Sequence, residues 1–296
     1  MTFQNISVVG AGTMGNGIAQ VFAQNGFKVS LYDHFPEVLP KAVATIEKNL
    51  SRLVSKEKLR TDQAQAALIN IQTHTDLAAA VAQADLVVEA AIEDEGQKKA
   101  LFQTLDQQAP SHAILASNTS SILIGRLEAA THRKGQLIGM HFFNPVPMMR
   151  LVEVIRTPHT QQSVFDAVFG LAQTLGKVPV EVNDAPGFVA NRVLMPMINE
   201  AANTWNAGVA GIAEIDTVMQ LGMAHPMGPL RLADFIGLDV CVAILEVLQT
   251  ELQNDHYAPA PILLQLLAAG DLGQKSGRGF YDYSQDPKNP TPRNLR

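Results

Sequence analysis

The start of the chain alternates between short apolar strand patterns and amphipathic helix patterns. Residues 6–9 are mainly apolar and β-branched, and residues 16–25 carry apolar side chains at helical spacing. Gly26 stands where a helix-ending glycine belongs, and residues 27–32 alternate as a second strand. This order predicts a β-α-β unit at the beginning of a parallel sheet.

The same alternation continues through the first two-thirds of the chain. Helical patterns cover residues 36–69 and 97–105. Further strand patterns are short and mostly apolar; they lie at residues 84–90, 113–117, 137–140, 151–155 and 178–182. Strands that alternate with helices indicate a mainly parallel sheet covered on both faces.

The pattern changes at residues 183–187, Asn-Asp-Ala-Pro-Gly, where loop-forming residues cluster. Beyond them we expect helices, with one short strand at 279–281. The predicted helices span residues 188–205, 212–221, 230–252 and 260–269. The first of these is apolar around much of its circumference, which is typical of a helical domain or of a subunit interface.

We therefore expect an α/β chain with two domains. A mainly parallel sheet domain covers residues 1–184 and includes a helical hairpin insertion near 36–70. A smaller, all-helical domain covers residues 185–296.

Three glycines fall between the first strand and the first helix with the spacing Gly-x-Gly-x-x-Gly. In this context Gly10 makes the tight turn and Gly12 lets the backbone approach a pyrophosphate. Gly15 lets the helix pack closely on the strand. The context predicts a dinucleotide-binding domain of the Rossmann type, because a glycine turn alone is weak evidence but the flanking strand and helix are also present.

Two further features complete this predicted cofactor site. Thr13 and Met14 open the helix, whose N-terminal N–H groups attract phosphate. Asp33 ends the second strand, where a carboxylate can accept hydrogen bonds from a ribose 2′-hydroxyl. Because that carboxylate repels a 2′-phosphate, we expect NAD rather than NADP.

The composition limits the class of protein. With 296 residues, 47% hydrophobic and 17% charged, the chain has ample core for packed domains. A net charge of −6 argues against nonspecific nucleic-acid binding. The single cysteine, Cys241, lies among apolar residues and cannot form an internal disulfide, so a buried thiol and a cytoplasmic location are expected. No signal-peptide pattern or membrane-spanning run is found in the sequence.

The hairpin segment is basic although the whole chain is acidic. Between residues 41 and 60 only Glu47 and Glu57 oppose a basic set, which consists of Lys41, Lys48, Arg52, Lys56, Lys58 and Arg60. Such a surface can meet a phosphorylated ligand outside the sheet, or it can simply keep a helical hairpin solvated. Charge alone favours neither interpretation.

Polar residues follow predicted strands at three places, where open α/β sheets bind ligands. Residues 117–121, Ser-Asn-Thr-Ser-Ser, can cap the next helix or bind a substrate oxygen. His141 enters a loop stiffened by Pro145 and Pro147. Asn191 opens the apolar helix and can tie the domains together or polarise a bound carbonyl.

His141 gains a partner in Glu153, an ionisable residue inside the apolar run 151–155. A buried carboxylate is costly unless it is paired or hydrogen-bonded. If the two segments run antiparallel, the imidazole and the carboxylate can meet. The carboxylate then fixes the histidine tautomer and makes the other ring nitrogen a general base suited to neutral pH.

Taken together, these residues resemble the L-3-hydroxyacyl-CoA dehydrogenase family. The length is similar to that of its stand-alone members, including the bacterial 3-hydroxybutyryl-CoA dehydrogenases. Family motifs occur in order along nearly the whole chain: the glycines with Asp33, then residues 117–121, 141–148, 151–154, 186–192, 225–229 and 275–281.

The resemblance implies reversible oxidation of a (3S)-3-hydroxyacyl-CoA to the 3-ketoacyl-CoA, with NAD as the cofactor. It implies that the helical domain serves the substrate and forms a homodimer. It also implies roles in fatty acid metabolism and β-oxidation. Its catalytic residues would be His141, Glu153, Ser120 and Asn191. Its NAD site would add Glu93, Lys98, Ser120, Asn144 and Lys275 to the glycine loop and Asp33.

The resemblance places Asn49 and Lys56 at the coenzyme A contact, together with Ser120 at the substrate. Some members have serine in place of Asn49, although either side chain can hydrogen-bond. Two other functions stay open: a sugar-acid dehydrogenase of the lambda-crystallin type, and a non-catalytic NAD-binding structural or sensor protein. The sequence does not determine the acyl chain length.

Overall fold

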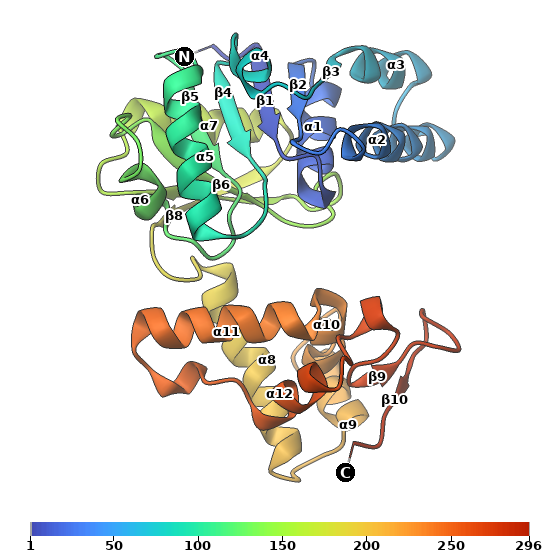
Figure 1. The fold of residues 1–296 in the computed structure, drawn as a ribbon. Helices are drawn as coiled ribbons and strands as arrows, with labels where there is room; N and C mark the ends of the chain where they lie inside the picture. The colour runs from blue at the N-terminus through green and yellow to red at the C-terminus, as the bar shows by residue number, and fades with distance from the viewer. Residues whose placement is uncertain (1, 296) are drawn as a thin grey trace. The chain divides into compact units, whose positions relative to one another are not determined.

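The computed structural model describes residues 2–295, and the chain divides between Ala185 and Pro186 into two compact units (Figure 1). Each unit contains its own cluster of buried apolar side chains. The units are therefore described one at a time.

A single large sheet forms the centre of the first unit. Within the described residues it has eight strands in the order β3-β2-β1-β4-β5-β6-β7-β8. The strands are β1 Asn5–Val9, β2 Lys28–Tyr32, β3 Ile71–His74, β4 Leu86–Glu89, β5 Ile114–Ser117, β6 Leu137–Phe142, β7 Leu151–Arg156 and β8 Val178–Asn183. Neighbours in this sheet are parallel except for β6 and β7, which are antiparallel.

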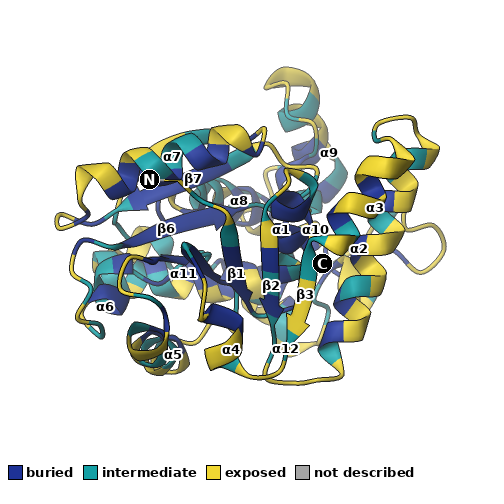
Figure 2. Cartoon of the chain, turned by 90° about the horizontal axis from the view of Figure 1, so that it is seen from above, coloured by how far each residue is buried: buried dark blue, intermediate teal, exposed yellow. Residues whose placement is uncertain are grey.

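Helices connect these strands and cover the sheet. They are α1 Thr13–Gln24, α2 Val38–Ser55, α3 Thr61–Ile69, α4 Leu77–Val81, α5 Glu95–Gln108, α6 Ile124–Glu128 and α7 Gln162–Thr174. Every residue of β4 and β5 is buried, as parallel strands between two helical layers must be. Figure 2 shows the resulting contrast between the buried central strands and the exposed outer face of α2 and α3.

In the first unit the sequence patterns missed one strand and placed the end of another two residues too early. The edge strand β3 was not predicted, because its two central residues are exposed and leave no apolar pattern. Strand β6 was expected to end at residue 140, with His141 in a loop. In the structure β6 extends to Phe142, because His141 and Phe142 pair with Glu153 and Val152 of β7.

The second unit is built mainly from helices around the apolar core that they share. Its helices are α8 Ala190–Asn206, α9 Ile212–Thr217, a π-helical turn η1 Val218–Gly222, α10 Pro229–Ile236, α11 Leu238–Leu252 and α12 Pro261–Ala268, with 3₁₀ turns η2 Asp255–Tyr257 and η3 Gln274–Ser276. The short strand expected at residues 279–281 corresponds to β9 Tyr281–Asp282, which begins at the last of these residues. It pairs with β10 Thr291–Pro292, a strand that was not predicted.

The helix expected over residues 230–252 is in fact two helices. Gly237 ends α10 and begins α11 with φ at 106°, a conformation that favours glycine and interrupts a helix. Since both halves are apolar on their inner faces, the periodicity alone did not reveal the break. Cys241 on α11 is buried, as expected, and burial raises the pKa of its thiol to about 12.

Two buried aspartates anchor the end of the chain in this unit. Asp234 accepts hydrogen bonds from the Phe280 and Tyr281 N–H groups, at 2.9 and 2.8 Å, and from the Tyr283 hydroxyl. Asp216 accepts one from the Tyr281 hydroxyl at 2.7 Å. These bonds hold residues 280–283 against α9 and α10. In the part of the chain that the structure describes, no helix is long and apolar enough to cross a membrane.

Candidate active site

The glycine loop has the geometry that a dinucleotide turn needs. A Cβ on Gly10 would lie 2.5 Å from the Ala90 carbonyl oxygen, and one on Gly15 would lie 1.7 Å from the Gly10 carbonyl oxygen. A Cβ on Gly12 would meet nothing within 4 Å. The first and third glycines are thus required by the protein itself, while the second opens onto free space above the N-terminus of α1.

Asp33 is positioned at the end of β2 to face this loop. Its Oδ2 accepts a hydrogen bond of 2.7 Å from the Ala11 N–H, and its Oδ1 accepts one of 2.9 Å from the Phe35 N–H. Each carboxylate oxygen has a further lone pair for a sugar hydroxyl. Thr13 is exposed, and Met14 is half-buried against the apolar core. These residues fit a dinucleotide: an open glycine turn, a helix N-terminus and an acid beside it.

His141 and Glu153 form a buried pair at the carboxyl end of β6. They are direct register partners across the antiparallel β6–β7 ladder. Glu153 Oε2 lies 2.7 Å from His141 Nδ1, and the two residues are 7% and 2% exposed. The carboxylate holds the proton on Nδ1, so Nε2 is the nitrogen that can accept a proton from a substrate. The Phe143 ring, 4.5 Å away between centroids, packs against the imidazole.

The polar run 117–121 forms a loop gathered around Glu93. Glu93 Oε1 accepts hydrogen bonds from the Thr119 hydroxyl at 2.6 Å and from the Ser120 N–H at 3.0 Å. It also accepts from the Ser121 hydroxyl at 2.9 Å. Burial by itself would raise the pKa of Glu93, but Lys98 and these donors outweigh it and hold the pKa below its usual value. Glu93 thus fixes the loop that carries Ser120.

The same loop is joined to the strand of the histidine. Asn118 accepts a hydrogen bond of 2.9 Å at Oδ1 from the Phe142 N–H, next to His141. Its own N–H donates to the Glu89 carbonyl oxygen at 2.8 Å. The structure therefore brings Ser120, Glu93 and His141 to one edge of the sheet, where β4, β5 and β6 end.

Lys98 lies inside the protein rather than on the crevice surface. Its side chain is 1% exposed, and Nζ lies 2.5 Å from Glu89 Oε1, 3.3 Å from Glu93 Oε2 and 3.3 Å from the Ala91 carbonyl oxygen. Glu89 was not among the predicted site residues. It carries the signal that pointed to Glu153, an acid in an apolar strand, so that signal could have revealed it.

The remaining predicted residues of the first unit lie at its surface. Asn144 is exposed and directly precedes a cis Pro145. Lys56 is exposed at the C-terminal end of α2, while Asn49 on the same helix is half-buried and donates from Nδ2 to Gln20 Oε1 at 3.1 Å. This bond engages the amide nitrogen of Asn49, and an amide oxygen is a hydrogen-bond acceptor.

Two predicted site residues belong to the second unit. Asn191 is buried in the first turn of α8, as the helix pattern predicted. Lys275 is exposed in the turn η3, and Nζ lies 2.7 Å from Asp239 Oδ2.

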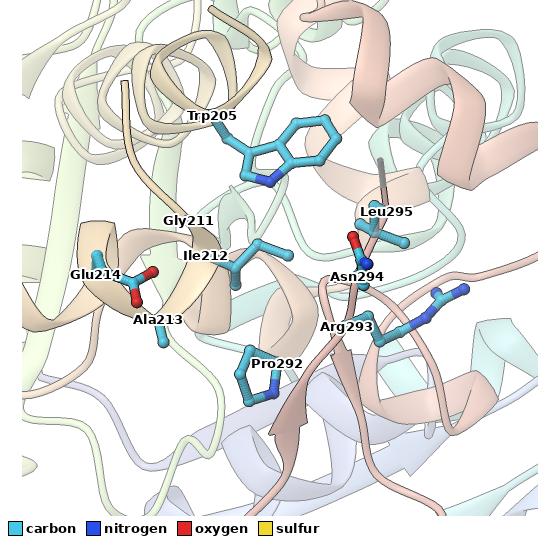
Figure 3. Close-up of a pocket in the computed structure, with 9 residues that line it drawn as sticks. All are labelled: Trp205, Gly211, Ile212, Ala213, Glu214, Pro292, Arg293, Asn294 and Leu295. Atoms are coloured by element: carbon cyan, nitrogen blue, oxygen red, sulfur yellow. The ribbon is translucent and has the colours of Figure 1, made fainter. Parts of the chain in front are cut away.

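The second unit also has a pocket of about 300 Å³ framed by Trp205, Ile212, Pro292 and Leu295 (Figure 3). None of the predicted site residues lines it. Its one guanidinium, that of Arg293, is bound to Asp271 Oδ2 at 2.7 Å and to the Gly279 carbonyl oxygen at 2.8 Å. The predicted pair of His141 and Glu153 lies instead in the first unit, at the sheet edge where β6 ends.

Comparison with known proteins gives a consistent result over the whole chain. Residues 5–185 match the family model "3-hydroxyacyl-CoA dehydrogenase, NAD binding domain", and residues 187–283 match "3-hydroxyacyl-CoA dehydrogenase, C-terminal domain". A probable 3-hydroxybutyryl-CoA dehydrogenase of Bacillus subtilis is 50% identical, with 96% of this chain and 99% of the relative covered. The mitochondrial hydroxyacyl-coenzyme A dehydrogenase of Rattus norvegicus is 43% identical, with 95% and 91% covered.

A solved structure agrees with these relatives. The (S)-3-hydroxybutyryl-CoA dehydrogenase PaaH1 from Ralstonia eutropha superposes with a TM-score of 0.93 at 46% identity. The match covers 96% of this chain and 100% of that one.

Proposed function

The chain belongs to the 3-hydroxyacyl-CoA dehydrogenase family, and we propose that it catalyses the reversible, NAD-dependent oxidation of a (3S)-3-hydroxyacyl-CoA to the 3-ketoacyl-CoA. Relatives named 3-hydroxybutyryl-CoA dehydrogenase at 45–50% identity support a short acyl chain. The observation that carries the proposal is the buried His141–Glu153 pair, which lies at the sheet edge where the glycine turn opens.

His141 is the general base of the proposed reaction. NAD, held by the glycine turn and Asp33, would supply the acceptor for the hydride from C3 of the substrate. As the C3–H bond breaks, Nε2 of His141 accepts the proton of the 3-hydroxyl. In the reverse direction the imidazolium returns this proton to the substrate oxygen. Glu153 stabilises the positive charge that develops on the ring, because its carboxylate contacts Nδ1 at 2.7 Å.

The other site residues bind and orient. Gly10, Gly12 and Gly15 with the N-terminus of α1 receive the pyrophosphate, and Asp33 receives the ribose. Ser120 is held by Glu93 in the loop beside His141, which supports its assignment to the substrate oxygen. For Asn191 and Lys275, which belong to the second unit, the proposed roles at the reacting carbonyl and at NAD rest on the family resemblance alone. Lys98 acts on the NAD site from the protein interior, through its contact with Glu93.

The basic hairpin supports coenzyme A as the carrier. Lys56 is exposed at the end of α2, and Asn49 has its carbonyl oxygen for hydrogen bonding. Phosphate groups of coenzyme A would be attracted to this surface, whereas a free sugar acid lacks them.

We further propose a homodimer formed through the second unit, and the cytoplasm as the compartment. Large apolar side chains of this unit are exposed, including Val193 on α8 and Val218 and Leu221 in the π-helical turn. A single buried cysteine suits a reducing compartment. We also propose that the reaction serves acyl-CoA metabolism, with β-oxidation as the pathway.

An NADH-consumption series tests the function. The purified chain should oxidise NADH with acetoacetyl-CoA, and the rate of NADH consumption should fall as the acyl chain of the 3-ketoacyl-CoA becomes longer. Reduction of NAD with a free sugar acid, and none with acyl-CoA, would instead support the lambda-crystallin type of activity. NADH binding without turnover of any of these substrates would support a structural or sensor role.

A further inference from the structure

Three ionisable side chains are stacked at the carboxyl end of β4, and the innermost has no place in the mechanism above. Glu89 is 0% exposed and Lys98 is 1% exposed, while Glu93 is 38% exposed at the surface of the same cluster. The order from inside to outside is therefore acid, base, acid. Lys98 is the only one of the three in contact with both of the others.

The buried pair is fully hydrogen-bonded. Glu89 Oε1 accepts from Lys98 Nζ at 2.5 Å and from the Ala91 N–H at 2.7 Å, and Oε2 accepts from the Ser117 hydroxyl at 2.6 Å. A buried ion pair contributes little net stability compared with apolar side chains of the same volume, because desolvation offsets the attraction. A gain in stability therefore explains poorly why an ion pair is buried at this position. Orientation of the neighbouring side chains explains it better.

The cluster reaches the Ser120 loop by two routes. On one side the Ser117 oxygen, held by Glu89, accepts a hydrogen bond of 3.2 Å from the Thr119 N–H. On the other side Lys98 holds Glu93, which accepts hydrogen bonds from the Ser120 N–H and the Thr119 hydroxyl. Both routes begin at the two oxygens of Glu89 and end in the same loop.

The register of the sheet connects this loop with the glycine turn. Glu89 pairs with Val9, which precedes the glycine turn, and with Ser117, which precedes the loop. Gly10 packs directly on the Ala90 and Ala91 backbone. A shift of the β4 end would therefore move the glycine turn and the Ser120 loop together.

We propose that Glu89 is a positioning residue of the dinucleotide site, which acts through Lys98 and Ser117 to fix Glu93 and the Ser120 loop against the glycine turn. Glu89 itself does not touch the ligand. This inference rests on the proposed function only in taking a nicotinamide dinucleotide as the ligand.

The test compares Glu89→Gln with Glu128→Gln in the full chain. Glu128 is also a buried acid of the first unit, but it binds the Gly135 N–H, which precedes β6, and the ring of His159, which follows β7. Both partners lie at the opposite edge of the sheet from the carboxyl end of β4. Both variants should lose thermal stability. Only Glu89→Gln should raise the NADH dissociation constant, by about tenfold, because a charged hydrogen-bonding partner is lost beneath the site. Glu128→Gln should stay within about twofold of wild type.

Ser117→Ala provides a milder second variant, since it removes one hydroxyl and leaves the ion pair in place. It should also weaken NADH binding. In a double-mutant cycle, the effects of Glu89→Gln and Ser120→Ala on NADH binding should be coupled. The fold increase in dissociation constant of the double variant should be at least about threefold smaller than the product of the two single-variant increases.

The outcomes separate this inference from the proposed function. Wild-type chain that fails to bind NADH would contradict the proposed function. Wild-type binding that Glu89→Gln and Ser117→Ala leave unchanged, or that Glu128→Gln weakens equally, would overturn the role of Glu89. Strictly multiplicative effects of Glu89→Gln and Ser120→Ala would also overturn it, because the loop would then not carry the effect.

Discussion

Glu153 and His141 face each other directly across the one antiparallel step of the described sheet, with 2.7 Å between Oε2 and Nδ1. Twelve residues separate them in the chain, and the strand pairing alone brings them together. Because both are buried, the pair has a fixed geometry in a medium of low dielectric constant, where charge stabilisation is strongest.

Replacing Glu153 with Gln tests this pair. The amide preserves the shape and a hydrogen bond but stabilises an imidazolium poorly, so turnover should fall about 10²-fold or more. Folding should persist, as circular dichroism will show. Glu181→Gln on the neighbouring strand β8, which removes an exposed ion pair with Arg156, is the control and should retain activity. Unchanged turnover of Glu153→Gln across the pH range would exclude the acid from the mechanism.

The glycine loop allows a paired prediction, because its glycines are constrained for different reasons. Gly12→Ala adds a methyl group to open space at an ordinary φ of −64°, so the melting temperature should hardly change. NADH affinity should fall about tenfold or more, because the methyl group fills the space that a pyrophosphate needs. Gly15→Ala creates a clash with the Gly10 carbonyl oxygen and should cost about 2 kcal/mol or more of stability.

Calorimetry and NADH fluorescence titration together check this pair of variants. A Gly12→Ala chain with normal NADH affinity would show that the dinucleotide binds elsewhere.

Asp33 should determine the choice between the two nicotinamide cofactors. Asp33→Asn keeps an oxygen for the Ala11 N–H but removes the charge that repels a 2′-phosphate. The ratio of kcat/KM for NADPH to that for NADH should rise about tenfold. Initial rates with both cofactors measure this ratio. A wild-type preference for NADPH would show that another residue outweighs the carboxylate.

Lys56 should affect binding of the coenzyme A part of the substrate and not binding of the acyl group. Lys56→Glu reverses an exposed charge of the basic hairpin, so KM for acetoacetyl-CoA should rise about threefold to tenfold at low salt and less at high salt. A thioester analogue that lacks the nucleotide phosphates serves as the matched substrate. An equal rise in KM for that analogue would exclude a phosphate contact.

Asp234 makes the stability of the second unit depend on pH. Burial raises the pKa of this carboxyl from 3.8 to about 6 despite hydrogen bonds from Phe280, Tyr281 and Tyr283. The folded state therefore binds its proton more tightly than the unfolded state does. The resulting stabilisation, about 3 kcal/mol, is complete below pH 3.8 and is lost as the pH rises through 6.

The measurement is the difference in melting temperature between wild type and Asp234→Asn, which should decrease as the pH rises from 4 to 7. Asp255→Asn, at an exposed position, provides a control whose difference should stay flat. A wild-type advantage that grows with pH would contradict the raised pKa.

Local sequence was sufficient for the parts of this protein that depend on neighbours in the chain. The strand, glycine turn and helix at its start are specified within about 20 residues, because turn geometry and helix periodicity are short-range properties. The glycines do not merely mark the site: the backbone contacts of Gly10 and Gly15 exclude any larger residue. The α/β fold class follows from these local patterns, whereas the reaction class was predicted from the resemblance to the L-3-hydroxyacyl-CoA dehydrogenase family over nearly the whole chain.

Tertiary structure decided what depends on partners distant in the chain. Strand β3 forms because β2 offers it hydrogen bonds, although its own sequence Ile-Gln-Thr-His has no apolar alternation. The extension of β6 through His141 depends on its register with β7, and a register cannot be seen in either strand alone. The buried Glu89–Lys98 pair exists only because α5 packs beside β4, and burying one of these charges requires the other to be there.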